Sequence, residues 1–282
     1  MNKPQKVFLE TTIMVDRLCK DRETKSKIEK ILSNYNKTYT SNYARMEFKK
    51  GFIQHLVYLH GKVVQCKDLT DVFEAISRLS ATPKGHLLGS ILENIKNFYK
   101  KIYQTKPSEI IKNHGDISLD EYLKEMAESY LNNLIRNSWR RFDKVVDEMV
   151  NPMKCFVDIE PPRKLGRIYD NTPRSCNKSK YKCEIRKFFN DMPESFTDIF
   201  NRLGNLHNPD TETINRIRSL REILRVRKRD IRTKDCWNCS DAIMAVEAPN
   251  DSDIFNNNQK HYIPICEAIG KKSIGYDSLP QN

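Results

Sequence analysis

Residues 6–12 of the chain read Lys6-Val7-Phe8-Leu9-Glu10-Thr11-Thr12, and this stretch decides the expected fold. Its three consecutive apolar residues form a run short enough for a strand that is buried on both faces, as strands of parallel sheets are. The run ends in a carboxylate and two hydroxyls. Because binding sites of open parallel sheets lie beyond the carboxyl ends of the strands, we expect Glu10 to extend from its strand into a cleft.

Two later stretches carry acids that could meet Glu10 in that cleft. The first is Ser41-Asn42-Tyr43-Ala44-Arg45-Met46-Glu47-Phe48, in which Ser41 or Asn42 caps a helix that runs to about His60 and has Glu47 on its second turn. The second is Cys239-Ser240-Asp241-Ala242-Ile243-Met244-Ala245, the start of an apolar helix that ends at Pro249. An acid at the first turn of such a helix indicates a functional role, whereas the position of Glu47 fits an ordinary exposed side chain equally well.

Composition limits the class of protein. The 282 residues, 38% hydrophobic and 30% charged, suffice for one large domain or for a core domain with a substantial insertion. No apolar run approaches the ~20 residues of a membrane span. The eight cysteines are irregularly spaced, and no signal-peptide core precedes the first strand. We therefore expect reduced thiols, a cytoplasmic location and no membrane partner.

The net charge of +12 is concentrated in two segments. Residues 163–187 and residues 216–234 each hold nine Lys or Arg against two acids, so the rest of the chain is close to neutral. Such local positive charge is typical of a surface that binds a polyanion, although a solvated charged face is the simpler alternative. The candidate contacts to nucleic acid are Arg163, Lys164, Arg167, Arg218, Arg221, Arg225 and Arg229.

Helical periodicity dominates the middle of the chain. Residues 22–35 and 68–150 read as helices, and the latter range contains three apolar stripes, the last of which runs from Leu119 to Met149 behind a Ser118 cap. Residues 151–182 are rich in Pro, Asn and Ser and read as irregular, with a lone strand at 156–159. Helices are expected again at 194–203 and 211–229, with short strands at 39–40 and 254–255.

The cysteines offer a competing metal site. Cys236 and Cys239 form a Cys-x-x-Cys pair, and Cys176 and Cys183 lie in the basic region. A structural zinc site usually has two tight pairs, and the second pair here is loosely spaced. Packing of these thiols is the favoured interpretation, with zinc as the alternative.

Together these residues resemble the PIN-domain nuclease family, whose fold many bacterial toxin ribonucleases share. The resemblance lies in Leu9-Glu10-Thr11 after the first strand, in Glu47 early in a helix, in Asp241 to Ala245, and in Asn256 to Tyr262 before the closing helix. It covers roughly residues 6–60 and 236–272. It implies an α/β fold with a small parallel sheet flanked by helices. The expected core halves are 1–60 and 231–272, with a helical insertion at 61–150, a basic loop-and-helix insertion at 151–230 and a tail at 273–282.

The resemblance also implies a function and its site residues. The chain would be a metal-dependent endoribonuclease with Glu10, Glu47 and Asp241 as catalytic acids, and with these and Asn258 as ligands of Mg²⁺ or Mn²⁺. Its partner would be RNA, and an inhibitory protein or a homodimer stays open. Glu10 stands where the family normally has Asp, and Asn258 and His261 stand where it has acids. A degenerate PIN-like protein that binds nucleic acid or a partner without cleavage is therefore the alternative, and a plain interaction scaffold is a third.

Overall fold

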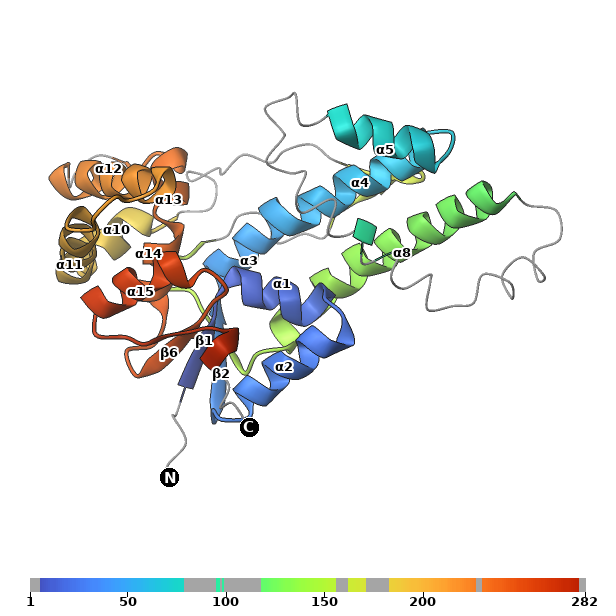
Figure 1. Cartoon of the computed structure of the whole chain (residues 1–282). Helices are drawn as coiled ribbons and strands as arrows, with labels where there is room; N and C mark the ends of the chain where they lie inside the picture. Colours follow the sequence, from blue (N-terminus) through green and yellow to red (C-terminus); the bar gives the residue numbers. More distant parts are fainter. Residues whose placement is uncertain are drawn as a thin grey trace.

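The computed structural model describes residues 6–78, 95–96, 98, 118–155, 162–170, 183–226 and 230–278. It is an α/β fold with a five-stranded parallel sheet in the order β3-β2-β1-β6-β7, flanked by helices (Figure 1). The strands are β1 (Lys6–Leu9), β2 (Lys37–Ser41), β3 (Glu148–Val150), β6 (Ser252–Phe255) and β7 (Ser273–Ile274). The predicted α/β class and the three strands expected at 7, 39 and 254 are confirmed.

The central strand is β1, which pairs in parallel with β2 on one side and β6 on the other. Val7, Phe8 and Leu9 are fully buried, as a strand covered on both faces requires. Because all three strands run in the same direction, their carboxyl ends lie at one edge of the sheet. Glu10, the helix after Ser41 and the loop at Asn256 therefore begin at that edge.

The helices next to this edge begin as the sequence predicts. Helix α1 (Thr11–Cys19) follows β1 directly and leads to α2 (Arg22–Leu32). Helix α3 (Asn42–Phe48) is capped by Ser41, whose hydroxyl accepts a bond from the Ala44 amide at 3.1 Å. It continues through a π-helical turn at Lys49–Ile53 into α4 (Gln54–Gln65). The single helix expected from 41 to about 60 is thus confirmed, one turn longer than predicted.

Beyond the sheet, α4 packs along the long helix α8 (Leu119–Arg141), and α5 (Leu69–Ser77) packs against both (Figure 1). The predicted cap of α8 is confirmed, because Ser118 and Glu121 form a reciprocal capping box. Most of the apolar stripe expected at 87–102 lies outside the described residues.

The end of α8 corrects the prediction of one helix to Met149. The helix ends at Arg141, a 3₁₀ turn covers Phe142–Lys144, and Glu148–Val150 forms β3. Here tertiary pairing overrides the helical periodicity: β3 pairs with β2, and the Asp147 carboxylate accepts bonds from the amide and hydroxyl of Thr38 at 2.7 and 2.8 Å. The central sheet also takes up β3, from the expected helical insertion, and β7, from the expected tail.

The basic region has its own small elements. An antiparallel hairpin of β4 (Lys164–Leu165) and β5 (Ile168–Tyr169) lies in the segment expected to be irregular. Next follow α10 (Ile185–Asp191), α11 (Pro193–Gly204) and α12 (Thr211–Arg225), and α11 packs on both α12 and α15 (Figure 1). The expected strand at 156–159 lies outside the described residues, and α12 ends four residues earlier than predicted.

Next come α13 (Thr233–Asn238), which packs on α12, and then α14 (Ser240–Glu247) and α15 (Gln259–Ala268), which pack on each other (Figure 1). Helix α14 is apolar and almost wholly buried, and Ala242 and Ala245 are fully inaccessible. The expected apolar helix before Pro249 is therefore confirmed. Among the described helices, none combines the length and the apolar character needed to cross a membrane.

Candidate active site

Glu10 occupies the junction of β1 and α1. Its side chain is 5% exposed and caps α1, since it accepts bonds from the amide of Thr12 at 2.9 Å and from the Thr12 hydroxyl. Burial raises the pKa of Glu10 to about 7, against the opposing effect of these bonds, and the Asp241 carboxylate raises it further. The first predicted acid is thus buried, well fixed and close to half-protonated at neutral pH.

Glu47 lies on α3 and is tied to the end of β1. The hydroxyl of Thr11 donates to its Oε2 at 2.8 Å. Burial raises the pKa of Glu47 to about 8, and the charges of Glu10 and Asp241 contribute to the rise. The sequence alone did not decide whether Glu47 faces solvent or the cleft. In the structure, its bond to Thr11 and the charges of Glu10 and Asp241 link it to the other two acids.

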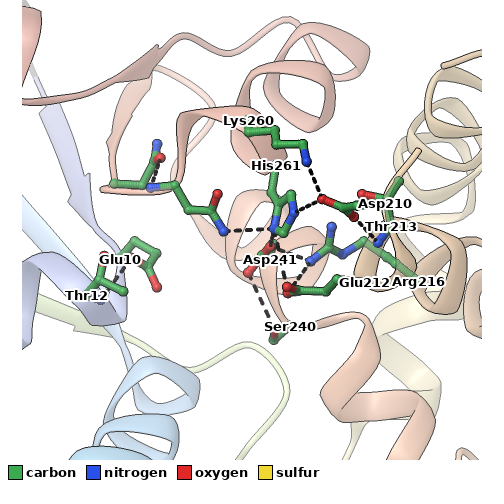
Figure 2. A network of polar contacts seen from close by, with 12 residues as sticks. Glu10, Thr12, Asp210, Glu212, Thr213, Arg216, Ser240, Asp241, Lys260 and His261 are labelled. Carbon is green, nitrogen blue, oxygen red and sulfur yellow. Dashed lines mark hydrogen bonds and ion pairs between the residues drawn. The ribbon is translucent and has the colours of Figure 1, made fainter. Parts of the chain in front are cut away.

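Asp241 opens α14 and is 8% exposed. Its Oδ2 accepts a bond from the guanidinium of Arg216, a residue of α12 that is 1% exposed. The Oδ1 atom lies 3.5 Å from the hydroxyl of Ser240 (Figure 2). Arg216 thus neutralises one side of the carboxylate from a helix that is remote in sequence.

The three acids are coupled through their charges, and Tyr262 of α15 lies within reach of the same charges. Asp241 raises the pKa of both Glu10 and Glu47, and all three acids raise the pKa of Tyr262. Tyr262 is 1% exposed, and its hydroxyl has no hydrogen-bond partner among the described residues. Glu10, Glu47 and Asp241 are thus linked by their charges, which also reach the orphaned hydroxyl of Tyr262, but the ligand atoms of these three acids do not all lie within 4.8 Å of one another.

One group of possible metal ligands lies within the described residues, and it contains Asp241 but neither Glu10 nor Glu47. Single ligand atoms of Glu212, Asp241 and His261 lie within 4.8 Å of one another. The guanidinium of Arg216 already lies among them, 3.4 Å from Glu212 and in contact with Asp241 (Figure 2). These ligand atoms can hold a cation. In the structure, the guanidinium of Arg216 supplies the positive charge.

His261 is drawn into the same network from α15. Its Nδ1 lies 3.7 Å from Asp241, and its Nε2 lies 3.0 Å from Asp210, the cap of α12 (Figure 2). These carboxylates raise the pKa of His261, Asp241 first, while Lys260 at 2.8 Å holds the pKa of Asp210 far below its usual range. The raised pKa favours the charged form of the imidazole beside Asp241, whereas a metal ion would need the neutral ring.

The fourth predicted ligand, Asn258, contacts this network through His261. Its Nδ2 lies 2.8 Å from Nδ1 of His261, and its backbone amide donates to the side chain of Asn256 at 3.1 Å. The loop before α15 thus holds Asn258 beside the ion pairs of Asp241.

The predicted basic residues lie in two separate places. Arg218, Arg221 and Arg225 form an exposed row on α12, with Arg221 over the ring of Phe200. Arg163, Lys164 and Arg167 are exposed at the β4–β5 hairpin, which packs on α4, and Arg167 pairs with Glu128 at 2.6 Å. Arg229 lies outside the described residues.

Sequence reasoning missed Arg216 and Tyr262. The buried positions of α12 are Thr213, Arg216, Ser219, Leu220 and Ile223, whereas the apolar residues Ile217 and Leu224 are only partly buried. The sequence did contain a signal for Arg216, since it lies at helical spacing from Leu220 and Ile223 and so on the apolar face. A fully buried arginine requires a partner acid. Tyr262 reads as an ordinary core residue, and only the fold brings it to the acids.

The cysteine pair has other neighbours. Cys239 is fully buried, and burial raises the pKa of its thiol well above the usual value. The Cys236 sulfur lies 3.7 Å from the Tyr43 hydroxyl. Within the described ranges, the one group of possible metal ligands contains no cysteine, and Cys176 lies outside those ranges.

Comparisons with protein-family models, with curated proteins and with solved structures gave no match to this chain. The class of the protein therefore rests on the fold and on the acids at the carboxyl edge of its sheet.

Proposed function

We propose that the chain is a divalent-metal-dependent endoribonuclease, built as a divergent PIN-like core with a helical insertion and a basic insertion. The observation that carries the proposal is the electrostatic coupling of Glu10, Glu47 and Asp241, which come from β1, α3 and α14. A carboxylate whose pKa is raised by burial and by neighbouring acids, as in Glu10 and Glu47, is costly to ionise without a compensating cation, and such groups often mark functional sites.

The residues at this place fit Mg²⁺ or Mn²⁺. Their donors are carboxylate oxygens, which hard divalent ions prefer, and the orphaned hydroxyl of Tyr262 is a suitable partner for a metal-bound water. When bound, such an ion supplies a nucleophilic water at neutral pH and neutralises charge on a phosphate.

The chain's own residues have distinct parts in the proposal. Glu10, Glu47 and Asp241 hold the ion. Thr11 fixes Glu47, and Thr12 fixes Glu10, each through a hydroxyl bond. Arg216 neutralises Oδ2 of Asp241 from a fully buried position on α12. The exposed row on α12 adds sequence-independent attraction to the strand.

The test is a cleavage assay on labelled single-stranded RNA with Mg²⁺, Mn²⁺ or EDTA, with single-stranded DNA as a second substrate. We expect cleavage of RNA with either ion and none with EDTA. Asp241→Asn and Glu47→Gln should each lower the rate by about a hundredfold or more, because each removes a charged ligand. Glu125→Gln, at an exposed position of α8, is the matched control and should cleave like the wild type. Absence of RNA cleavage by wild-type protein with both ions would contradict the proposal.

A second candidate function is binding of nucleic acid without cleavage, and the ion pair of Arg216 with Asp241 favours it. An arginine that permanently replaces the metal would leave a site that only binds. In that case wild-type protein would bind RNA in a salt-dependent manner without cleaving it, and Asp241→Asn would not change the rate of RNA turnover in any metal.

A further inference from the structure

A pocket of about 490 Å³ lies away from the three acids, between α3, the second half of α8 and the β4–β5 hairpin. Its size is within the usual range for sites that hold a small molecule or one unit of a polymer. Helix α8 lines it from Asn132 to Arg140, the 3₁₀ turn after the helix adds Asp143 and Lys144, and Lys164 and Tyr169 of the hairpin also line it. The elements that form it were all expected to be insertions, except α3.

The lining of the pocket is strongly basic. Five basic side chains face one acid: Arg45, Arg136, Arg140, Lys144 and Lys164, with Asp143. Arg136, Arg140 and Lys144 recur every four residues, so they form a row along α8 and the turn that follows it. Like charges at this spacing destabilise a helix by a few tenths of a kcal/mol each. A row that costs stability and faces a pocket indicates an anionic occupant.

Arg45 is prepared for such an occupant. Its side chain is 19% exposed, and its guanidinium lies 5.2 Å from the centre of the Trp139 ring and 3.9 Å from Asp143. Its buried Nε has no hydrogen-bond partner among the described residues. A buried donor without a partner costs about 1–3 kcal/mol, and an anion in the pocket would satisfy it.

The aromatic residues shape the wall of the pocket but do not offer faces for stacking. Trp139 is 6% exposed and Tyr169 is 4% exposed. Tyr169 is bonded to Asn132 and packs edge-on against His60. Recognition here therefore depends on charge and on the backbone of the ligand and not on its bases.

We propose that this pocket binds backbone phosphates of single-stranded RNA next to the segment that reaches the acids. The link is α3, which carries Arg45 in the pocket and Glu47 in the candidate active site. A single strand can bend a phosphate into an enclosed pocket, whereas a duplex presents its phosphates on a stiff surface. The choice of RNA as the ligand rests on the proposed function, but the phosphate site itself does not.

The test measures binding of a short fluorescent oligouridylate by anisotropy over a series of salt concentrations, in EDTA, so that cleavage does not interfere. The pocket variant is Arg136→Gln with Arg140→Gln and Lys144→Gln. The control is Lys27→Gln with Lys30→Gln and Lys272→Gln, which removes the same charge from exposed positions elsewhere. We expect the pocket variant to bind at least about tenfold more weakly. Its slope of log affinity against log salt should flatten by ~0.7 for each lost contact.

The single change Arg140→Glu, at an exposed position, provides a second binding measurement in case the triple variant folds poorly. Thermal melting shows whether each variant is folded. Duplex RNA and uridine diphosphate serve as competitors, and we expect the single strand to compete best. Equal weakening by the pocket and control variants, or wild-type affinity of Arg140→Glu, would overturn the inference. The two proposals can fail separately. If the pocket variant binds RNA more weakly but wild-type protein does not cleave it, only the nuclease proposal is contradicted. If wild-type protein cleaves RNA and the pocket variant binds it as tightly as wild type, only the pocket proposal is contradicted.

Discussion

Glu10 follows β1 directly and caps α1, and this double position gives a physical reason for the length of its side chain. The carboxylate turns back to accept bonds from the amide and hydroxyl of Thr12, and it still acts on Asp241 and Glu47. The longer side chain allows both.

We therefore expect Glu10→Asp to keep the fold and lose activity. The shorter chain can still cap α1, but it withdraws the carboxylate by one bond, roughly 1.5 Å. A displacement of that size can lower a rate by about a hundredfold. Single-turnover cleavage of RNA, with melting temperature as the check on folding, measures the effect. A rate equal to or above the wild-type rate would mean that the site is not shaped around glutamate.

Glu247 offers a test of burial that is independent of function. It ends α14, is 6% exposed, and burial raises its pKa to about 8. Because the folded-state pKa lies above the unfolded value near 4.5, its contribution to stability is complete below about pH 4.5 and is lost as the pH rises through about 8.

The variant Glu247→Gln stays neutral at every pH. We expect it to gain stability relative to wild type between about pH 5 and pH 9, by a few kcal/mol at most. Urea unfolding of both proteins across that range measures the difference. Glu125→Gln, at an exposed site, should run parallel to wild type. A constant difference between wild type and Glu247→Gln would show that the carboxyl is not buried as described.

At the scale of elements, α12 carries arginines in two different environments on its two faces. The outer face carries the row Arg218, Arg221 and Arg225, and the inner face delivers Arg216 to Asp241. Periodicity predicted the helix and the outer row, because exposed charges follow helical spacing. It could not predict the ion pair, since that depends on how α12 packs against α14 and α15 through α11.

Arg216→Met tests whether a metal can replace the arginine. Removal of one partner of a buried ion pair costs about 3–5 kcal/mol. At about 2–4 °C per kcal/mol, the variant should melt roughly 10 °C lower in EDTA. Addition of Mn²⁺ should then raise its melting temperature more than that of wild type, because the ion takes over the charge of the guanidinium.

Arg202→Met is the control for this experiment, since Arg202 forms an exposed pair with Glu267 on the surface of α11 and α15. It should change neither melting temperature nor its response to Mn²⁺ by more than a small amount. An equal response to Mn²⁺ in Arg216→Met and wild type would mean that the arginine and the ion do not compete for Asp241.

At the scale of the whole molecule, the sequence predicted the parts that are local. Val7 to Leu9 marked the central strand, Ser41 and Ser118 marked helix starts, and Asp241 stood out against an apolar helix. The edge strands β3 and β7 escaped prediction because two or three residues carry no period, and their pairing partners are distant in sequence. Tyr262, Arg216 and the basic pocket escaped for the same reason, since each exists only through contacts between separate elements.

The central claim is that Glu10, Glu47 and Asp241 form one metal site, and the most direct measurement is anomalous diffraction from crystals of the protein soaked in Mn²⁺. We predict one strong peak among these three carboxylates. The distances from the ion to the carboxylate oxygens should be roughly 2.0–2.2 Å, and a bound water should lie near the Tyr262 hydroxyl. The same crystals should show Asp241 shared between the ion and Arg216. A peak confined to Glu212 and His261, or no peak while Arg216 stays on Asp241, would contradict the account.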